Sequence, residues 1–194
     1  MSVRHNLLAI LSLGPCYGYQ LRTEYERRTG GARTLNVGQI YNTLDRLERD
    51  GLVQRAHTDD QGHVYYQVTD DGRVTAERWL HEGVPATFDE AIERLAMAST
   101  IAGADAAHLL RRHRAAATDH LRGLSAHPAS PPSSGEELAA AIALEARIAG
   151  AEAELRWLDR AEALLSRAAH DGVTRELPLS TDVPKRGRPA RLTS

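Results

Sequence analysis

Gln39, Tyr41 and Asn42 are polar side chains that stand close together in a short, well-delimited stretch of the chain. Amide groups such as those of Gln39 and Asn42 can pair with the hydrogen-bonding edges of nucleic-acid bases, and Gly38 beside them permits a close approach of the backbone. Any small amphipathic helix also exposes a few polar and aromatic residues, so these side chains alone do not establish base reading. Their meaning depends on the elements that hold them.

Residues 34–53 have the signals of one helix with a defined start and end. Asn36 is suited to cap the helix with its side-chain oxygen, and Gln39, three residues later, is suited to bond back to the Asn36 amide. Gly51 provides an end in the left-handed conformation. Apolar residues recur on one face at spacings of four and three: Ile40, Leu44 and Leu47. The opposite face therefore carries short, polar and aromatic side chains near the start of the helix, as a helix that reads a DNA groove requires.

The surrounding residues predict the elements that would position this helix. Two helices precede it, and after it the apolar pattern changes from a helical period to the alternation of strands. The expected elements are helices at 3–13, 17–28 and 70–83 and strands at 52–57 and 63–69. Three helices, a two-stranded hairpin and a helix are the order of a winged helix-turn-helix domain, which we place at residues 1–84.

The same residues resemble the PadR family of bacterial transcriptional regulators. The resemblance covers about residues 5–80, and its motifs occur in the family's order: Leu11-Ser12-Leu13-Gly14-Pro15, Tyr17-Gly18-Tyr19, Gly38-Gln39-Ile40-Tyr41, Glu48-Arg49-Asp50-Gly51-Leu52-Val53 and Tyr65-Tyr66-Gln67-Val68-Thr69. It implies a DNA-binding regulator, typically a repressor, that dimerises through a C-terminal helical region. It also implies release from DNA by a small aromatic or drug-like effector.

Gly38, Gln39, Tyr41 and Asn42 are our candidates for contact with the major groove. Basic side chains near the helix and in the wing are weaker candidates for contact with phosphates: Arg33, Arg46, Arg49 and His63. Family members usually carry Ser or Thr at the positions of Asn36 and Gln39, so the longer amide of Gln39 is available either to the cap or to an adenine. They tend to carry Arg or Lys before the Tyr pair of the wing, where this chain has His63-Val64. We expect a weak phosphate grip near neutral pH that strengthens when His63 is protonated.

The charge of the chain is distributed unevenly. The net charge is −2 at pH 7, with −1 in residues 1–88, −5 in residues 89–182 and +4 in residues 183–194. Any affinity for DNA must therefore come from local clusters of cations rather than from a global field.

The cysteine count and the length of the apolar runs indicate the cellular compartment that we expect for the protein. Because Cys16 is the single cysteine of the chain, an internal disulfide and a multi-cysteine zinc site are excluded. A single cysteine also fits a reducing cytoplasm, which is our expected location. We expect Cys16 to be a small buried side chain rather than a nucleophile. No stretch approaches the roughly 18 to 20 apolar residues of a membrane span, so we expect no membrane partner.

Residues 85–172 are expected to form an all-α dimerisation domain. Thr87 begins one helix, Asp105 caps a second that runs to about residue 124, and Ser134 caps a last helix that runs to about residue 169. The last helix carries a heptad-like seam that includes Leu144, Ile148, Leu155, Leu158 and Leu165. Following the family resemblance, we assign this seam to a homodimer interface. The alternative is that it packs only against the chain's own helix at 105–124.

Two groups of side chains are of types that can bind a metal ion or a small molecule. His113, His120 and His127 recur every seven residues, but seven residues rise about 10 Å along a helix, so they cannot share an ion. We expect surface histidines, with a pH-sensing face or an inter-subunit site as the alternatives, and we expect no metal and no cofactor. Trp79 and Trp157 are weak candidates for an effector site, and ordinary packing is the alternative for each.

Residues 173–194 are expected to be a disordered basic tail. Within it, Pro184-Lys185-Arg186-Gly187-Arg188-Pro189 resembles an AT-hook, in which glycine lies at the floor of a narrow minor groove and arginines lie along its walls. Arg186 and Arg188 are accordingly candidates for DNA contact. A purely solubilising tail is the alternative.

The sequence thus predicts a mainly α protein with a winged helix-turn-helix domain, a two-stranded wing and an all-α dimerisation domain. The predicted function is that of a cytoplasmic homodimeric repressor that binds double-stranded DNA at an inverted repeat and is released by an effector. The rival is a winged-helix module that binds proteins, or an activator without operator repression. No nucleophile motif, phosphate loop or convergent carboxylate pair is present in the sequence, so we do not expect an enzyme.

Overall fold

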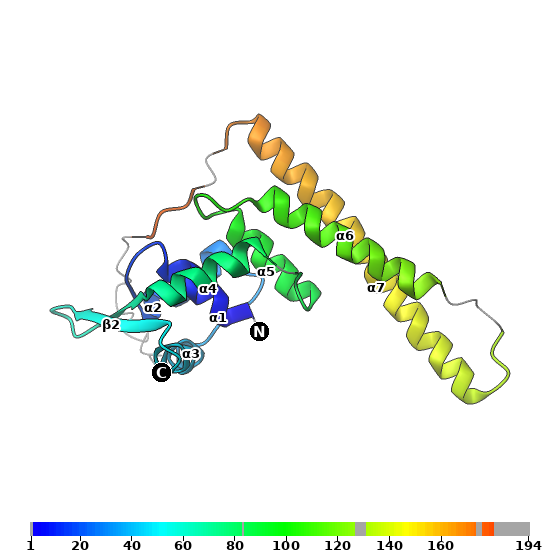
Figure 1. Ribbon diagram of the computed structural model, residues 1–194, viewed down its shortest axis with the longest axis horizontal. Coiled ribbons are helices and arrows are strands. Elements are labelled where there is room, and N and C mark those ends of the chain that lie inside the picture. The colour runs from blue at the N-terminus through cyan, green and yellow to red at the C-terminus, as the bar shows by residue number, and fades with distance from the viewer. Residues whose placement is uncertain (1, 83, 127–130, 174–175, 181–194) are drawn as a thin grey trace, which may run out of the picture.

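The computed structural model describes residues 2–82, 84–126, 131–173 and 176–180 (Figure 1). The elements follow in the order α1 (Ser2–Leu11), β1 (Cys16–Tyr17), α2 (Gly18–Arg28), α3 (Val37–Arg49), β2 (Val53–Thr58), β3 (Val64–Val68), α4 (Asp70–His81), α5 (Phe88–Ala98), α6 (Ala106–Ser125) and α7 (Gly135–His170). The protein is mainly helical, and α1 to α4 with the strands form a winged helix-turn-helix domain. The predicted fold class is confirmed. We call the hairpin of α6 and α7 the helical arm.

The β-sheet has three strands where the sequence predicted two. β2 and β3 form the expected hairpin, and β1 pairs with the other edge of β3, with Cys16 opposite Tyr66 and Tyr17 opposite Tyr65. β1 contains only two residues, so no alternation of side chains indicates it in the sequence. It joins the start of α2 to the wing.

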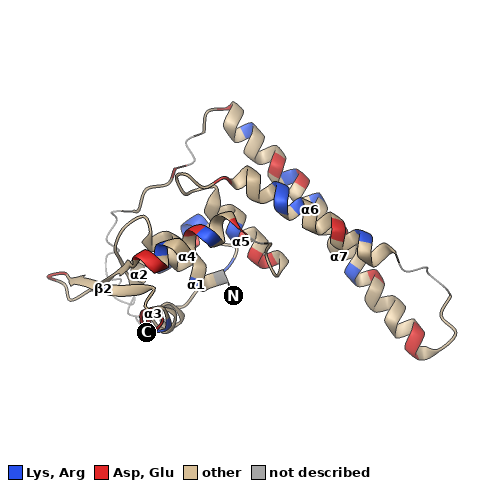
Figure 2. Ribbon diagram, viewed as in Figure 1, with Lys and Arg blue, Asp and Glu red and all other residues tan. Residues whose placement is uncertain are grey.

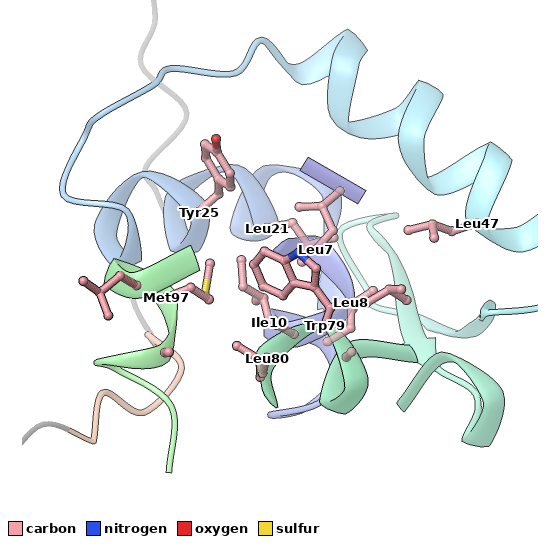
Figure 3. Close-up of a cluster of buried hydrophobic side chains, with 14 of the residues drawn as sticks. Leu7, Leu8, Ile10, Leu21, Tyr25, Leu47, Trp79, Leu80 and Met97 are labelled. Atoms are coloured by element: carbon pink, nitrogen blue, oxygen red, sulfur yellow. The ribbon is translucent and has the colours of Figure 1, made fainter. Parts of the chain in front are cut away.

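The second half of α1, residues 7–11, lies in the core of the domain and is apolar on every side. Leu7, Leu8 and Ile10 are completely buried, in a cluster that also contains Trp79 of α4 (Figure 3). Gly72 is required at the start of α4, because a Cβ atom there would stand 2.0 Å from the carbonyl oxygen of Leu52. The close approach brings the start of α4 against the turn between α3 and β2.

Cys16 is completely buried in this core, and burial raises the pKa of its thiol to about 12. The folded protein therefore carries a neutral, unreactive thiol at pH 8. We expect iodoacetamide to leave the folded protein unlabelled at pH 8 and to label one thiol per chain in concentrated urea, as followed by intact mass. Rapid labelling without urea would contradict the buried position.

The helical arm is held together by polar pairs between α6 and α7. His113 bonds to Glu154, and Arg114 pairs with Asp159 and Glu162. α7 has 36 residues and α6 has 20, so the first turns of α7 extend past the end of α6 (Figure 1). No helix in the described part of the chain is sufficiently long and apolar to cross a membrane.

The heptad-like seam of α7 faces α6 of the same chain. Leu158 is completely buried, and Leu155 and Leu165 are half-buried and pack against the core of the same chain. Their assignment to a homodimer interface stays a prediction. Leu144 and Ile148 are half-buried. A heptad period specifies an apolar seam but not whether the partner helix belongs to the same chain. The large apolar side chains that α7 exposes lie off the seam: Leu138, Ile142 and Leu164.

Residues 176–180 return from the end of α7 and lie against α2. We call this segment the clasp. The sequence predicted disorder from residue 173, but the clasp makes backbone hydrogen bonds to α2 and to Thr100, and Leu179 packs against the core. The AT-hook-like motif with Arg186 and Arg188 lies outside the described residues.

Candidate nucleic-acid interface

α3 begins with the capping box that its sequence predicts. The backbone N–H of Gln39 donates to Asn36 Oδ1 at 2.8 Å, and the N–H of Asn36 donates to Gln39 Oε1 at 3.0 Å. Leu35 and Ile40, at the positions of a hydrophobic staple, are both buried. Gly51 follows the helix with a φ of 72°. Local signals therefore fix both the start and the end of α3.

α3 has one buried face and one exposed face. Ile40, Leu44 and Leu47 are completely buried. The opposite face is exposed and carries the residues expected there: Gly38, Gln39, Tyr41, Asn42, Asp45, Arg46 and Arg49. A protruding helix with polar side chains in its first turns has the shape and the hydrogen-bonding groups to enter a major groove.

The Gln39 side chain is engaged by the cap. Its Oε1 accepts the Asn36 N–H, whereas a bidentate pair with adenine needs both Oε1 and Nε2. Base reading by Gln39 would therefore require the cap to open, at a cost in helix stability. Tyr41 and Asn42, which are exposed beyond the cap, are better placed for contact with bases.

The ring of Tyr41 packs against the first residue of α2. A Cβ atom at Gly18 would lie 2.6 Å from Tyr41 Cζ and 2.8 Å from the Tyr41 hydroxyl oxygen, so the ring keeps this position only beside glycine. Tyr41 nevertheless remains 41% exposed. The contact fixes the direction of an exposed side chain, and a group fixed in advance loses less entropy when it binds.

The wing histidine is turned back onto its own hairpin. His63 Nδ1 lies 2.9 Å from Asp59 Oδ2, and the ring stacks on Tyr17 at 4.6 Å between centroids. The backbone N–H of His63 also bonds to Asp59 and lowers the pKa of that carboxyl. The ionised Asp59 carboxylate would therefore offset a positive charge on the His63 ring. The geometry does not favour the stronger phosphate grip that we expected from protonation of His63.

The remaining wing surface is aromatic along its length and acidic at its tip. Tyr65 stacks on His57 at 4.4 Å and contacts Tyr17 at 5.3 Å. Figure 2 shows acidic residues at the hairpin tip, where the sequence has Asp59 and Asp60. The wing thus carries stacked rings along its length, and its acidic tip would repel a phosphate.

The basic candidates lie on different sides of the domain. Arg46 and Arg49 are exposed in the last turns of α3. Arg33 lines a groove beside α5, so the structure does not bring it to the exposed face of α3. Arg55 of β2 pairs with Glu48 of α3 at 3.3 Å and is 60% exposed, and it is a basic side chain near α3 that the sequence did not indicate.

A second candidate site lies where α5, α6 and α7 meet. Trp157 lines a cavity of about 10 Å³, too small for more than one water molecule. A neighbouring groove of about 290 Å³ is lined in part by Phe88, His113, His120 and Glu154. Phe88 meets Trp157 edge to face at 5.2 Å, so Trp157 lies behind the aromatic wall of this groove.

Trp79 and His113 are both core residues. Trp79 is 8% exposed and packs beneath the guanidinium of Arg94, and the structure does not bring it to the groove. His113 is buried, whereas the sequence predicted a surface position. His120 lines the groove, and His127 lies outside the described residues. Among the described residues, no three His, Cys, Asp or Glu side chains lie close enough together to hold a metal ion.

Two known protein families match the chain, one over the winged-helix domain and the other over the helices that follow it. Residues 7–78, which span α1 to most of α4, match the transcriptional regulator PadR-like family. Residues 89–166, from α5 to most of α7, match the family described as virulence activator alpha C-term. The winged-helix domain is therefore that of a PadR-like transcriptional regulator. This match places the domain among regulators of transcription and not among enzymes.

The similarity to other proteins covers most of the chain. The probable transcriptional regulator Rv1176c of Mycobacterium tuberculosis is 29% identical over 185 residues, which are 84% of this chain and 98% of that protein. Bacillus subtilis PadR in complex with operator DNA is 21% identical, over 84% of this chain and 99% of that chain, with a TM-score of 0.40. Bacillus subtilis PadR in complex with p-coumaric acid is 20% identical, over 86% of this chain and 99% of that chain, with a TM-score of 0.37.

The motif Tyr17-Gly18-Tyr19 contains a site residue, Gly18, whose role the sequence alone did not indicate. Gly18 receives the ring of Tyr41, although the two residues are far apart in sequence. A signal was present, because glycine is a poor helix former and yet occupies the first position of α2 between two tyrosines. The signal indicates a close contact but does not identify the partner.

Proposed function

We propose that this protein is a cytoplasmic homodimeric repressor that binds an inverted repeat in double-stranded DNA. The observation that carries the proposal is the exposed face of α3, where Gly18 fixes Tyr41 and Asn42 stands beside it. Hydroxyl and amide groups near the start of a protruding helix can bond to base edges in the major groove. Arg46 and Arg49, exposed further along α3, supply phosphate contacts.

Dimerisation is proposed through the exposed start of α7. The first turns of α7 project beyond α6 (Figure 1), and Leu138 and Ile142 in these turns are 50% and 63% exposed. Apolar side chains four residues apart form a stripe on one helix face, and the same stripe of a second copy can cover it in an isologous contact. A two-fold dimer would present two α3 helices to two half-sites separated by whole turns of DNA.

Replacing Ile142 with glutamate is expected to weaken the dimer about tenfold or more, because the contact would bury an unpaired charge from each copy. Sedimentation equilibrium measures the change in the dimer dissociation constant. Leu164→Glu is the matched control, since Leu164 is 66% exposed near the other end of α7. Equal weakening by the two variants would contradict dimerisation through residues 135–143.

We also propose that a small aromatic effector binds in the groove beside Trp157 and releases the DNA. The groove has an aromatic wall in Phe88, polar side chains in His113 and His120, and a volume near the lower limit for ligand sites, about 300 Å³. The chain has two tryptophans, so the Trp79→Phe variant leaves Trp157 as its only tryptophan. Quenching of that fluorescence by small aromatic acids, in step with loss of DNA binding, tests the site. Loss of DNA binding without quenching would place the effector elsewhere.

The proposed DNA-binding function is tested by a salt titration. Fluorescence anisotropy compares a duplex from the region upstream of the protein's own gene with a scrambled duplex of the same composition. We expect tighter binding to the natural duplex, with log K falling linearly as log salt rises. Equal, weak binding to both would favour the rival, a winged-helix module that binds proteins. The near-neutral charge of residues 1–88 and the exposed Asp45 on α3 are the observations that support this rival.

The direction of regulation is tested by transcript levels. The C-terminal match is to a family named for a virulence activator, which makes activation the competing outcome. Deletion of the gene is expected to raise transcription from the promoter that the protein binds, whereas a fall would identify an activator.

A further inference from the structure

An acidic side chain stands on the exposed face of α3. Asp45 follows Tyr41 by four residues and Asn42 by three, so the three side chains lie on one face of the helix. All three are exposed. A helix rises about 1.5 Å per residue, so Asp45 lies about 6 Å along the axis from Tyr41. Asp45 therefore continues the surface of Tyr41 and Asn42 toward the end of α3.

The other two carboxylates near the end of α3 are held by guanidinium groups. Glu48 Oε1 lies 3.3 Å from Nε of Arg55 in β2, and Asp50 Oδ2 accepts a hydrogen bond from a guanidinium of α1 at 2.6 Å. Within the part of the chain that the structure describes, the Asp45 carboxylate has no such partner. Arg49 follows Asp45 by four residues, a spacing at which helical ion pairs form, and it does not pair with Asp45. The Asp45 carboxylate is thus an acceptor that remains available to a ligand.

A free carboxylate in a major groove is selective because it accepts hydrogen bonds and donates none. Phosphate oxygens repel it, and so do the acceptor atoms of guanine and thymine. The donors on the base edges are the amino groups of adenine and cytosine. Adenine places the acceptor N7 beside its amino group, which suits an amide side chain better than a carboxylate, whereas the N4 amino group of cytosine has no acceptor beside it on the same base. Cytosine is therefore the base that fits a carboxylate.

We propose that Asp45 accepts a hydrogen bond from the N4 amino group of a cytosine in the major groove and so makes the protein prefer a C·G pair at one position of each half-site. Asn42, one turn earlier, carries the amide that matches adenine, so one helix face reads two kinds of base. Sequences that lack the cytosine face an unpaired negative charge, which weakens non-specific binding. The inference rests on the DNA-binding function proposed above.

The test is a change of base preference. The probe is the shortest upstream duplex that the full chain binds in preference to its scrambled form, and each of its base pairs is replaced in turn by the other three. Competition fluorescence anisotropy gives the relative affinity for each duplex. The natural protein is compared with Asp45→Asn, Asp45→Ala and Asp60→Asn, all as full chains. Asp60→Asn is the matched control, because it removes the same charge from the exposed tip of the wing.

At one position of each half-site, the natural protein is expected to bind a C·G pair about tenfold more tightly than any other pair. In Asp45→Asn the preference at that position should move from cytosine to adenine, because an amide both donates and accepts. Asp45→Ala should lose the preference there and keep the preferences at the other positions. Asp60→Asn should keep the natural preference at every position.

Two results would overturn the inference. An unchanged preference for cytosine in Asp45→Ala would assign that base to another residue. A uniform gain in affinity for all duplexes, similar in Asp45→Asn and Asp60→Asn, would show that Asp45 acts only through its charge. Circular dichroism and the unfolding midpoint verify that each variant is folded. Failure of the underlying function is a different result, because the natural protein would then show no preference for its upstream duplex over the scrambled one.

Discussion

Replacing Tyr41 with alanine is expected to weaken binding to the operator about 5- to 150-fold, the equivalent of about 1 to 3 kcal/mol, with little loss of folding stability. The reason is geometric. The Tyr41 ring is 41% exposed, yet its direction is set by the backbone of Gly18, so the variant removes a group that is already placed for contact. Anisotropy titration against the natural and scrambled duplexes measures the loss. An unchanged preference for the natural duplex would exclude Tyr41 from the reading surface.

A double-mutant cycle with Gly18 separates a direct contact from a general disturbance. Gly18→Ala displaces the ring, because the added methyl group would stand 2.6 Å from Tyr41 Cζ. It is expected to lower affinity in the natural background and to have no further effect when Tyr41 is already alanine. Tyr41→Phe retains the ring and reports the contribution of the hydroxyl group. Additive losses in the cycle would show that Gly18 acts on DNA binding by another route.

Replacing Glu24 with alanine is expected to lower the free energy of unfolding by about 3 to 5 kcal/mol, the range for removal of one partner from a buried ion pair. Glu24 and the side chain of Arg28 are completely buried, with Glu24 Oε2 at 3.0 Å from Arg28 Nε. Burial also lowers the pKa of Arg28, but a guanidinium stays charged, so the variant leaves an uncompensated cation in the core. Urea denaturation followed by circular dichroism measures the change.

Glu26→Ala is the matched control on the same helix. Glu26 pairs with Arg22 at 3.1 Å, but both side chains are about one-third exposed. Solvent-exposed pairs of this kind contribute roughly 0 to 1 kcal/mol, so this variant should unfold close to the natural midpoint. Similar losses for Glu24→Ala and Glu26→Ala would show that burial of the Glu24 carboxylate does not matter to stability.

Much of the fold could be predicted because its signals are local. Asn36 and Gln39 form the capping box that their types and spacing indicated, and Ile40 and Leu44 are buried as their period required. Ser134 likewise caps α7 through the N–H of Glu137. In each case the interacting groups are separated by three or four residues, so the sequence contains the geometry directly.

The features that could not be predicted depend on contacts between distant residues. β1 is recognised by its pairing with Tyr65 and Tyr66, since two residues have no period of their own. Gly18 and Tyr41 meet through the packing of α2 on α3, and the clasp joins residues separated by about 150 positions. The partner of the α7 seam was uncertain for the same reason. An apolar stripe in the sequence indicates that the helix face is covered but not by which element, and only the tertiary structure shows that α6 covers it.

The clasp gives the helical arm a second attachment to the winged-helix domain. The chain leaves that domain through α5, passes along α6, returns along α7, and is then bound again at α2 by Ser180 and Leu177. An arm joined by one linker could swing without moving the domain that carries it. Because α6 also packs against α4 and shares the core cluster of α1, rotation of the arm would have to disrupt that core and also break the bonds of the clasp to Glu24 and Arg28.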